Sequence, residues 1–325
     1  MRPVCLAVIG VAAVVAGCAG NAGRSASTQA ADRCVGQRVS CAELVELGLT
    51  YPYRRERGSY LFVDGAAFPY VRVTRGLLDD SLVSVRGEVM TAAALTRLLG
   101  APSPRGSLTP VLAYGANANV DALTRKYLSA ATPMSAVIPV IKGRLSGYDV
   151  TWSPQLVFNG AMPSTLTPSP GTVVSVWTTW LGNAELRRMN ATEGVGRLYS
   201  AGRLRGVRLR VPGPPVRDPL VYEDCRGPLR IGGRTLAVAG VPAQHRRFSA
   251  LDSSAAMRQV APALDWPGTA AALIVDNVRN PARRRDRDRT LAGLAAVVPD
   301  PHYRPFAACR AGSGATRRAR SSAAR

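Results

Sequence analysis

Residues 111–119 read Val111-Leu112-Ala113-Tyr114-Gly115-Ala116-Asn117-Ala118-Asn119, a β-prone run that breaks at a glycine and leads into a polar residue. Asn119 is a natural N-cap, and the apolar residues after it recur with helical spacing. The sequence therefore predicts a strand, a glycine turn and a helix. Because glycine lets a ligand approach the backbone closely, and amides at a helix start attract anions, we interpret Tyr114–Asn117 as a candidate binding loop.

C-terminal to this stretch, short β-prone runs alternate with turns rich in proline, glycine and serine, and helical patterns are few. The expected strands are Val137–Ile141, Tyr148–Trp152, Leu156–Phe158, Val173–Trp180 and Arg203–Val211, and the expected helices are Asn183–Met189 and Ser253–Val260. This pattern predicts an α+β fold, a small mixed β-barrel with peripheral helices. We expect it to occupy residues 106–310, with a C-terminal elaboration.

N-terminal to the stretch, residues 34–105 form a predicted extension. Two β-prone runs within Ser59–Val73 flank Asp64-Gly65, which favours a hairpin, and Thr91 is placed to cap a short helix. The run from Ala101 to Gly106 contains two prolines and a glycine. We interpret it as the loop that ends the extension.

A second candidate segment runs from Glu185 to Gly194. Leu186 and Met189 give the expected helix an apolar side, and Glu193 falls at its end, directly before a glycine. A carboxylate in that position is a candidate general base if it faces a cavity, or an ordinary solvent-exposed glutamate at a helix end.

Common catalytic motifs are absent from the sequence. It contains no G-x-S-x-G elbow, no G-x-x-x-x-G-K-[ST] loop and no H-E-x-x-H pair. The two histidines, His245 and His302, are too few for a multi-histidine metal site. We predict neither a metal nor a cofactor.

The two candidate segments, taken in order, resemble the γ-glutamylcyclotransferase family. Its pattern has a Tyr-Gly-Ser-Asn loop after the first barrel strand and, much later, a helix that ends in Glu-Gly and precedes a tyrosine. Here Tyr114–Asn117 matches the loop, Met189–Gly194 matches the helix end, and Tyr199 follows. Residues 160–171 resemble the family's turn into a central strand. The chain differs from the pattern at Ala116, where the family has serine, and at Asn190, where it has aspartate.

The resemblance implies a reaction in which the α-amino group of a γ-glutamyl unit attacks its own side-chain carbonyl and releases 5-oxoproline. Glu193 would be the acid/base, and the backbone amides of Gly115, Ala116 and Asn117 would hold the substrate carboxylate or the oxyanion. Tyr114 and Tyr199 would line the pocket. The alternative is a non-catalytic protein of the same fold that binds a ligand or has a structural role in the cell envelope.

The N-terminus resembles a bacterial lipoprotein signal. Arg2 precedes an apolar run of 14 residues, too short for a membrane span of about 20, and the run ends in Val15-Ala16-Gly17-Cys18. We expect residues 1–17 to be removed and Cys18 to carry the lipid. Residues 18–33, mostly small and polar, would be a flexible tether. The protein would then be anchored to the cell membrane, on its extracytoplasmic face.

Four further cysteines remain in the predicted mature chain: Cys34, Cys41, Cys225 and Cys309. An even number in an exported protein suggests two disulfides, and we pair Cys34 with Cys41 and Cys225 with Cys309. Buried free thiols are the alternative.

The net charge of +21 comes almost entirely from arginine, since only Lys126 and Lys142 are lysines. This bias is typical of a GC-rich genome. No aromatic residues interleave with the C-terminal arginines, so we predict no nucleic-acid partner. We interpret Arg283–Arg289 as a solvated loop and residues 311–325 as a disordered basic tail.

Overall fold

The computed structural model describes residues 40–102, 107–129 and 132–310. The strands are β1 (Tyr60–Val63), β2 (Ala66–Arg72), β3 (Leu82–Val85), β4 (Glu88–Thr91), β5 (Thr109–Ala113), β6 (Val137–Trp152), β7 (Ser164–Leu181), β8 (Tyr199–Leu204), β9 (Leu209–Arg210), β10 (Leu220–Asp224), β11 (Arg230–Ile231), β12 (Arg234–Val238), β13 (Ala243–Gln244), β14 (Ser249–Leu251) and β15 (Tyr303–Ala307).

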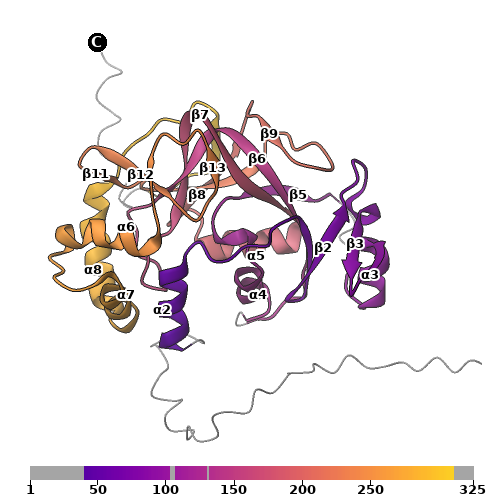
Figure 1. The fold of residues 1–325 in the computed structure, drawn as a ribbon, viewed down its shortest axis with the longest axis horizontal. Helices are drawn as coiled ribbons and strands as arrows, with labels where there is room; N and C mark the ends of the chain where they lie inside the picture. The colour runs from indigo at the N-terminus through magenta and orange to yellow at the C-terminus, as the bar shows by residue number, and fades with distance from the viewer. Residues whose placement is uncertain (1–39, 103–106, 130–131, 311–325) are drawn as a thin grey trace, which may run out of the picture.

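The α-helices are α2 (Cys41–Thr50), α3 (Ala92–Leu98), α4 (Val120–Tyr127), α5 (Asn183–Glu193), α6 (Ser253–Val260), α7 (Ala270–Arg279) and α8 (Pro281–Leu291). Short 3-10 turns are η1 (Leu78–Asp80), η2 (Ala116–Ala118), η3 (Ala261–Leu264) and η4 (Ala292–Leu294). Helices α2, α6, α7 and α8 gather at one end of the sheet, α4 and α5 lie near its middle, and α3 lies at the other end (Figure 1).

The predicted α+β class is confirmed, because one large and mostly antiparallel sheet carries several helices. Its main path runs β15-β8-β10-β5-β7-β6-β1-β2-β3-β4, and β10 with β5 is the parallel pair on that path. The predicted closed barrel is wrong. A barrel needs its terminal strands to pair, whereas in the described part of the chain β15 and β4 are the two ends of an open path.

A long hairpin of β6 and β7 forms the centre of the sheet, and it corrects several sequence expectations. The expected strands Val137–Ile141 and Tyr148–Trp152 are parts of the single strand β6, and the register of β6 with β7 shifts between Ser146 and Tyr148. Gly147 has φ +83° at this shift. The backbone therefore bends at a glycine without ending the strand.

The expected turn at residues 160–171 also continues into a strand, since β7 already begins at Ser164. Its Pro-Ser-Pro-Gly run lies at the register shift, where Pro168 is opposite Tyr148 and the register skips residues 169–172. Proline is tolerated at such a bulge. The hydroxyls of Ser169 and Thr172 lie 2.8 Å apart and bridge this irregular segment.

Two other expected strands differ from the structure. Leu156–Phe158 belongs to a turn, in which the amide of Val157 donates to the carbonyl of Ala161 at 3.0 Å. The expected strand Arg203–Val211 is interrupted, so that β8 ends at Leu204 and β9 is a short separate strand.

Several local predictions are confirmed, because they depend on a turn or a helix cap formed by a few neighbouring residues. The hairpin of β1 and β2 turns at Asp64-Gly65, and α3 begins where the Thr91 side chain accepts from the amide of Ala94 at 3.1 Å. Asn119 caps α4 through the amide of Ala122, at 2.8 Å. Helix α6 has the predicted bounds.

The prediction of a solvated loop at Arg283–Arg289 is wrong, since these residues lie within α8. The Arg/Asp alternation supplies ion pairs that fix the helix. Arg287 lies 2.6 Å from Asp276 of α7, and Asp288 lies 2.6 Å from Arg226. Arg287 and Asp288, which the sequence analysis placed in a solvated loop, are thus paired with residues from other parts of the chain.

The N-terminal segment is continuous with the rest of the described structure. β1 pairs with the first four residues of β6, and Leu44 of α2 is buried in the same apolar cluster as Leu273 and Ile274 of α7. The predicted boundary near Gly106 stays a prediction.

The predicted disulfide between Cys225 and Cys309 is present, with the two Cα atoms 5.6 Å apart. It ties the segment after β15 to the segment after β10. Cys41 is also disulfide-bonded, and its predicted partner Cys34 lies outside the described residues. The signal peptide, Cys18, the tether and the tail 311–325 lie outside them as well. No helix among the described residues has the length and apolar character needed to cross a membrane.

Candidate functional site

The loop that follows β5 is short and tightly held. β5 pairs with β7, and Ala113 lies opposite Trp177. After Tyr114 the chain forms η2, for which Gly115 is the N-cap, and Asn119 then starts α4. The central hairpin thus fixes one end of the loop, and the capped helix fixes the other.

Glu193 is the last residue of α5, and Gly194 ends that helix in the left-handed region with φ +61°. This conformation favours glycine and explains the Glu-Gly pair. The side chain of Glu193 is 13% exposed. It is therefore not a freely solvated residue at a helix end.

The structure brings Glu193 together with the loop that lies 76 residues earlier in the chain. The side-chain amide of Asn117 donates to Oε1 of Glu193 at 3.1 Å. Lys126 of α4 contacts the same oxygen at 2.5 Å, and its ammonium also donates to Thr192 at 2.9 Å. Three segments therefore converge on a single carboxylate whose charge Lys126 neutralises.

The two candidate tyrosines are buried beside this carboxylate. The hydroxyl of Tyr114 donates to the carbonyl of Tyr222 at 2.5 Å, and that of Tyr199 donates to the carbonyl of Ser164 at 3.3 Å. Burial raises the pKa of both phenols. Both are neutral donors already committed to backbone carbonyls, so they are not poised to give up a proton.

Gly115 is needed for packing. A Cβ at this position would lie 2.8 Å from the hydroxyl of Tyr51 and 2.9 Å from Oγ of Ser164. These two oxygens lie 2.6 Å from each other, and burial raises the pKa of Tyr51. The space expected to let a ligand approach the Cα of Gly115 is filled by a residue of the N-terminal segment.

The two positions that differ from the family pattern have distinct environments. Asn190 accepts a hydrogen bond from the hydroxyl of Tyr222 at 2.6 Å, so Tyr222 links Asn190 to Tyr114. Ala116 lies in η2 and is partly exposed. It contributes no side-chain donor to the loop.

Arg55 extends the site toward the central hairpin. It donates to the carbonyl of Tyr114 at 3.3 Å and to that of Gly240 at 2.8 Å, and its guanidinium lies 4.7 Å from the centre of the Trp177 ring. Burial lowers its pKa to about 10. A cation therefore lies directly behind the candidate loop.

Sequence reasoning missed five residues of this cluster: Tyr51, Arg55, Lys126, Ser164 and Tyr222. One of them carried a usable signal, since Lys126 is a rare lysine in a chain whose basic residues are otherwise nearly all arginine. Ser164 lies in the run 160–171 that resembles the family's turn, and the other three come from segments with no motif of their own.

No group of three or more His, Cys, Asp or Glu side chains in the described residues is arranged to hold a metal ion. The donors around Glu193 are an amide, an ammonium and hydroxyls, which suit an organic substrate better than a cation. Comparison of the chain with protein-family models, curated proteins and solved structures finds no match.

Proposed function

We propose that this protein is a γ-glutamylcyclotransferase-like enzyme that releases 5-oxoproline from a γ-glutamyl amine or a related amide. The observation that carries the proposal is the 3.1 Å contact between Asn117 of the glycine loop and Glu193. The resemblance to the family requires these two segments to meet, and nothing in their separate local sequences forces them to.

Glu193 has the arrangement expected of an acid/base. Asn117 and Lys126 both contact Oε1, and no side chain or backbone group in the described residues donates to Oε2. One oxygen is thus fixed while the other is open to a substrate proton. The adjacent ammonium and amide hold the carboxyl group in one orientation, as a positioned acid/base requires.

The reaction balances without a cofactor. The α-amino nitrogen of the substrate attacks its own side-chain carbonyl carbon, forming the new C–N bond, and Glu193 accepts the amine proton. The bond to the leaving nitrogen then breaks, and Glu193 returns the proton to that nitrogen. The products are 5-oxoproline and a free amine. Because the attack is intramolecular, holding the substrate in the ring-closing conformation supplies much of the acceleration.

The substrate must carry a free α-amino group. Cell-wall γ-glutamyl units normally have this nitrogen acylated, which leaves no nucleophile. We therefore propose a γ-glutamyl compound with an unblocked α-amine. Its carboxylate or the oxyanion would be held by the backbone amides of Ala116 and Asn117, because the space beside Gly115 is filled by Tyr51. Tyr114 and Tyr199 would form the pocket walls.

We further propose that the enzyme is exported and held on the extracytoplasmic face of the membrane by a lipid on Cys18. The disulfide between Cys225 and Cys309 supports export, because such bonds persist in oxidising compartments.

A non-catalytic role on the same scaffold is the second candidate, and one observation favours it. The 2.5 Å contact between Lys126 and Glu193 joins α4 to α5, as a purely structural ion pair would. In that case the protein would bind a ligand or serve a structural role in the cell envelope.

The test is to incubate the full mature chain with a panel of γ-glutamyl amines and to quantify 5-oxoproline. We expect Glu193→Gln to lower the rate by at least about 100-fold, the contribution typical of a positioned acid/base. Glu185→Gln, at the other end of the same helix, is the matched control and should retain activity. Equal rates for the wild type and Glu193→Gln would remove Glu193 from the mechanism, and no product from the wild type would favour the second candidate.

A further inference from the structure

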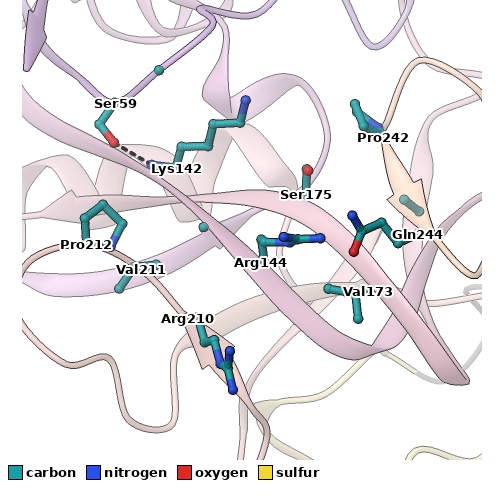
Figure 2. A pocket seen from close by; sticks show the side chains of 13 residues that line it. Ser59, Lys142, Arg144, Val173, Ser175, Arg210, Val211, Pro212, Pro242 and Gln244 are labelled. Carbon is teal, nitrogen blue, oxygen red and sulfur yellow. Dashed lines mark hydrogen bonds between the residues drawn. The ribbon is translucent and has the colours of Figure 1, made fainter.

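A second site lies on the face of the central hairpin, in a cleft of about 710 Å³. Two short strands bound it: β9, which pairs with β6 at Arg144 and Leu145, and β13, which pairs with β7 at Val173 and Val174. We call it the cationic cleft. Figure 2 shows the residues that line it, and none of them belongs to the cluster around Glu193.

Three basic side chains line the cleft, Lys142 and Arg144 from β6 and Arg210 from β9, and none of its lining residues is acidic. Arg144 and Arg210 are direct cross-strand partners. Like charges in such a position repel each other. The fold therefore concentrates positive charge here at some cost to its own stability.

The charge in the cationic cleft is not neutralised by the protein. Among the described residues, neither Arg144 nor Arg210 forms an ion pair or a side-chain hydrogen bond. Other arginines behave differently: Arg246 lies 2.9 Å from Asp149, and Arg226 lies 2.6 Å from Asp288. The guanidinium groups of Arg144 and Arg210 therefore have no acidic partner among the described residues.

Packing fixes the cleft in place. A Cβ on Gly143 would lie 2.4 Å from Cγ1 of Val211 and 2.7 Å from the carbonyl oxygen of Arg210. Only glycine lets β9 lie this close to β6 and hold Arg210 beside Arg144. Lys142 is anchored as well, since its ammonium donates to the carbonyl of Arg57 at 2.8 Å and lies 5.2 Å from the centre of the Trp177 ring.

Neutral groups around the cations define the ligand further. Figure 2 shows the side chains of Arg144, Ser175 and Gln244 around the space between the hairpin and β13, and all three line the cleft. The Ser175 hydroxyl and the Gln244 amide can donate to a bound anion. Val173, Val211 and two prolines supply apolar surface, which suits an organic body better than a hydrated inorganic ion.

We propose that the cationic cleft binds a small organic anion with at least two negative charges, either a phosphate ester or a dicarboxylate. Arg144 supplies the bidentate fork that both anions accept, and Lys142 and Arg210 supply the balancing charge. This site is separate from the proposed ring-closure site and does not depend on it.

Isothermal titration calorimetry of the full chain with glycerol 3-phosphate and with succinate tests the proposal. We expect saturable binding with a stoichiometry of one for at least one probe. The probe that binds identifies whether the anion is a phosphate or a carboxylate. Arg144→Gln should weaken this binding by at least about 10-fold, the loss expected for a charge-assisted contact.

Arg234→Gln is the matched control, because Arg234 is an exposed arginine on β12, outside the cleft, and its loss changes the net charge equally. It should alter the affinity by less than about twofold. Glu193→Gln should leave binding unchanged, since its carboxylate is not part of the cleft. Equal weakening by Arg144→Gln and Arg234→Gln would show only non-specific attraction to a basic protein. That result, or no saturable binding of either probe, would overturn the proposal.

Discussion

The two lysines of the chain lie in opposite electrostatic settings. Lys126 contacts Glu193 at 2.5 Å, so the site around that carboxylate is neutralised from within. Lys142 lies in a cleft with two arginines and no carboxylate. The first arrangement pairs a carboxylate with a cation of the protein, and the second leaves two arginine side chains without an acidic partner among the described residues. The same residue type therefore has two different electrostatic environments, which depend on the residues that the fold places next to it.

The largest effect that tests this contrast comes from removing each lysine in turn. Lys126→Met leaves a mostly buried carboxylate unpaired, and we expect a loss of about 2–3 kcal/mol in the free energy of unfolding. Lys142→Met removes a cation–π contact and a hydrogen bond but strands no charge, so its loss should be about 1 kcal/mol or less. Urea unfolding of both variants measures the difference. Equal losses would mean that the ion pair contributes no more than an ordinary surface contact.

A smaller change in stability is expected from the buried carboxyl group of Glu223, whose pKa is not lowered by a neighbouring cation. Burial, and then the neighbouring Asp300, raise the pKa of Glu223 to about 9. Its Oε1 is buried and has no hydrogen-bond partner in the described residues, while Tyr148 donates to Asp300 at 2.9 Å. Glu223 is therefore the counterpart of Glu193, a carboxyl group that is kept neutral by its surroundings.

The sign of the resulting pH dependence follows from proton binding. The folded state binds the Glu223 proton more tightly than the unfolded state does, so this stabilisation is complete at low pH and is lost as the pH rises through about 9. The free energy of unfolding should fall by up to about 1.4 kcal/mol per pH unit between about pH 6 and pH 8. Glu223→Gln should flatten that slope. An unchanged slope in the variant would assign the pH dependence to other groups.

The smallest expected change is in the stability lost to repulsion between Arg144 and Arg210 in the cationic cleft. Arg144→Gln removes one of two like charges that face each other across β6 and β9, and we expect it to stabilise the fold by about 0.2–0.5 kcal/mol at low salt. The gain should shrink as salt screens the repulsion. Thermal unfolding at two ionic strengths, with Arg234→Gln as reference, measures it. A destabilised Arg144→Gln protein would show that Arg144 has a structural role.

Much of the local structure could be predicted from the sequence, because caps and turns act over a few residues. Thr91 and Asn119 mark helix starts through their own side chains, and Asp64-Gly65 marks a hairpin. The resemblance to the γ-glutamylcyclotransferase pattern implied that Glu193 would face the loop Tyr114–Asn117, and the contact is made by Asn117.

Other elements could not be predicted because distant partners determine them. The Pro-Ser-Pro-Gly run before Val173 has the composition of a turn, yet it is part of β7, at the register shift opposite Gly147, where proline is tolerated. The arginine-rich segment of α8 becomes a helix because Asp276 and Arg226 satisfy its charges from elsewhere in the fold. β1 pairs with β6 and is followed by β2, β3 and β4, so the main path of the sheet ends at β4.

The sequence alone determined the α+β class and the helix caps, and it suggested the cysteine pair 225–309 and the two segments that meet at Glu193. The class and the caps depend on residue types and short spacings, whereas the meeting of the two segments was implied by the resemblance to a family pattern. Only the tertiary structure decided that Lys126 neutralises Glu193, that Tyr51 fills the space beside Gly115, and that Arg144 and Arg210 share an uncompensated cleft. These features depend on which strands pair and how closely they pack, and pairing between remote segments leaves no signature in either segment by itself.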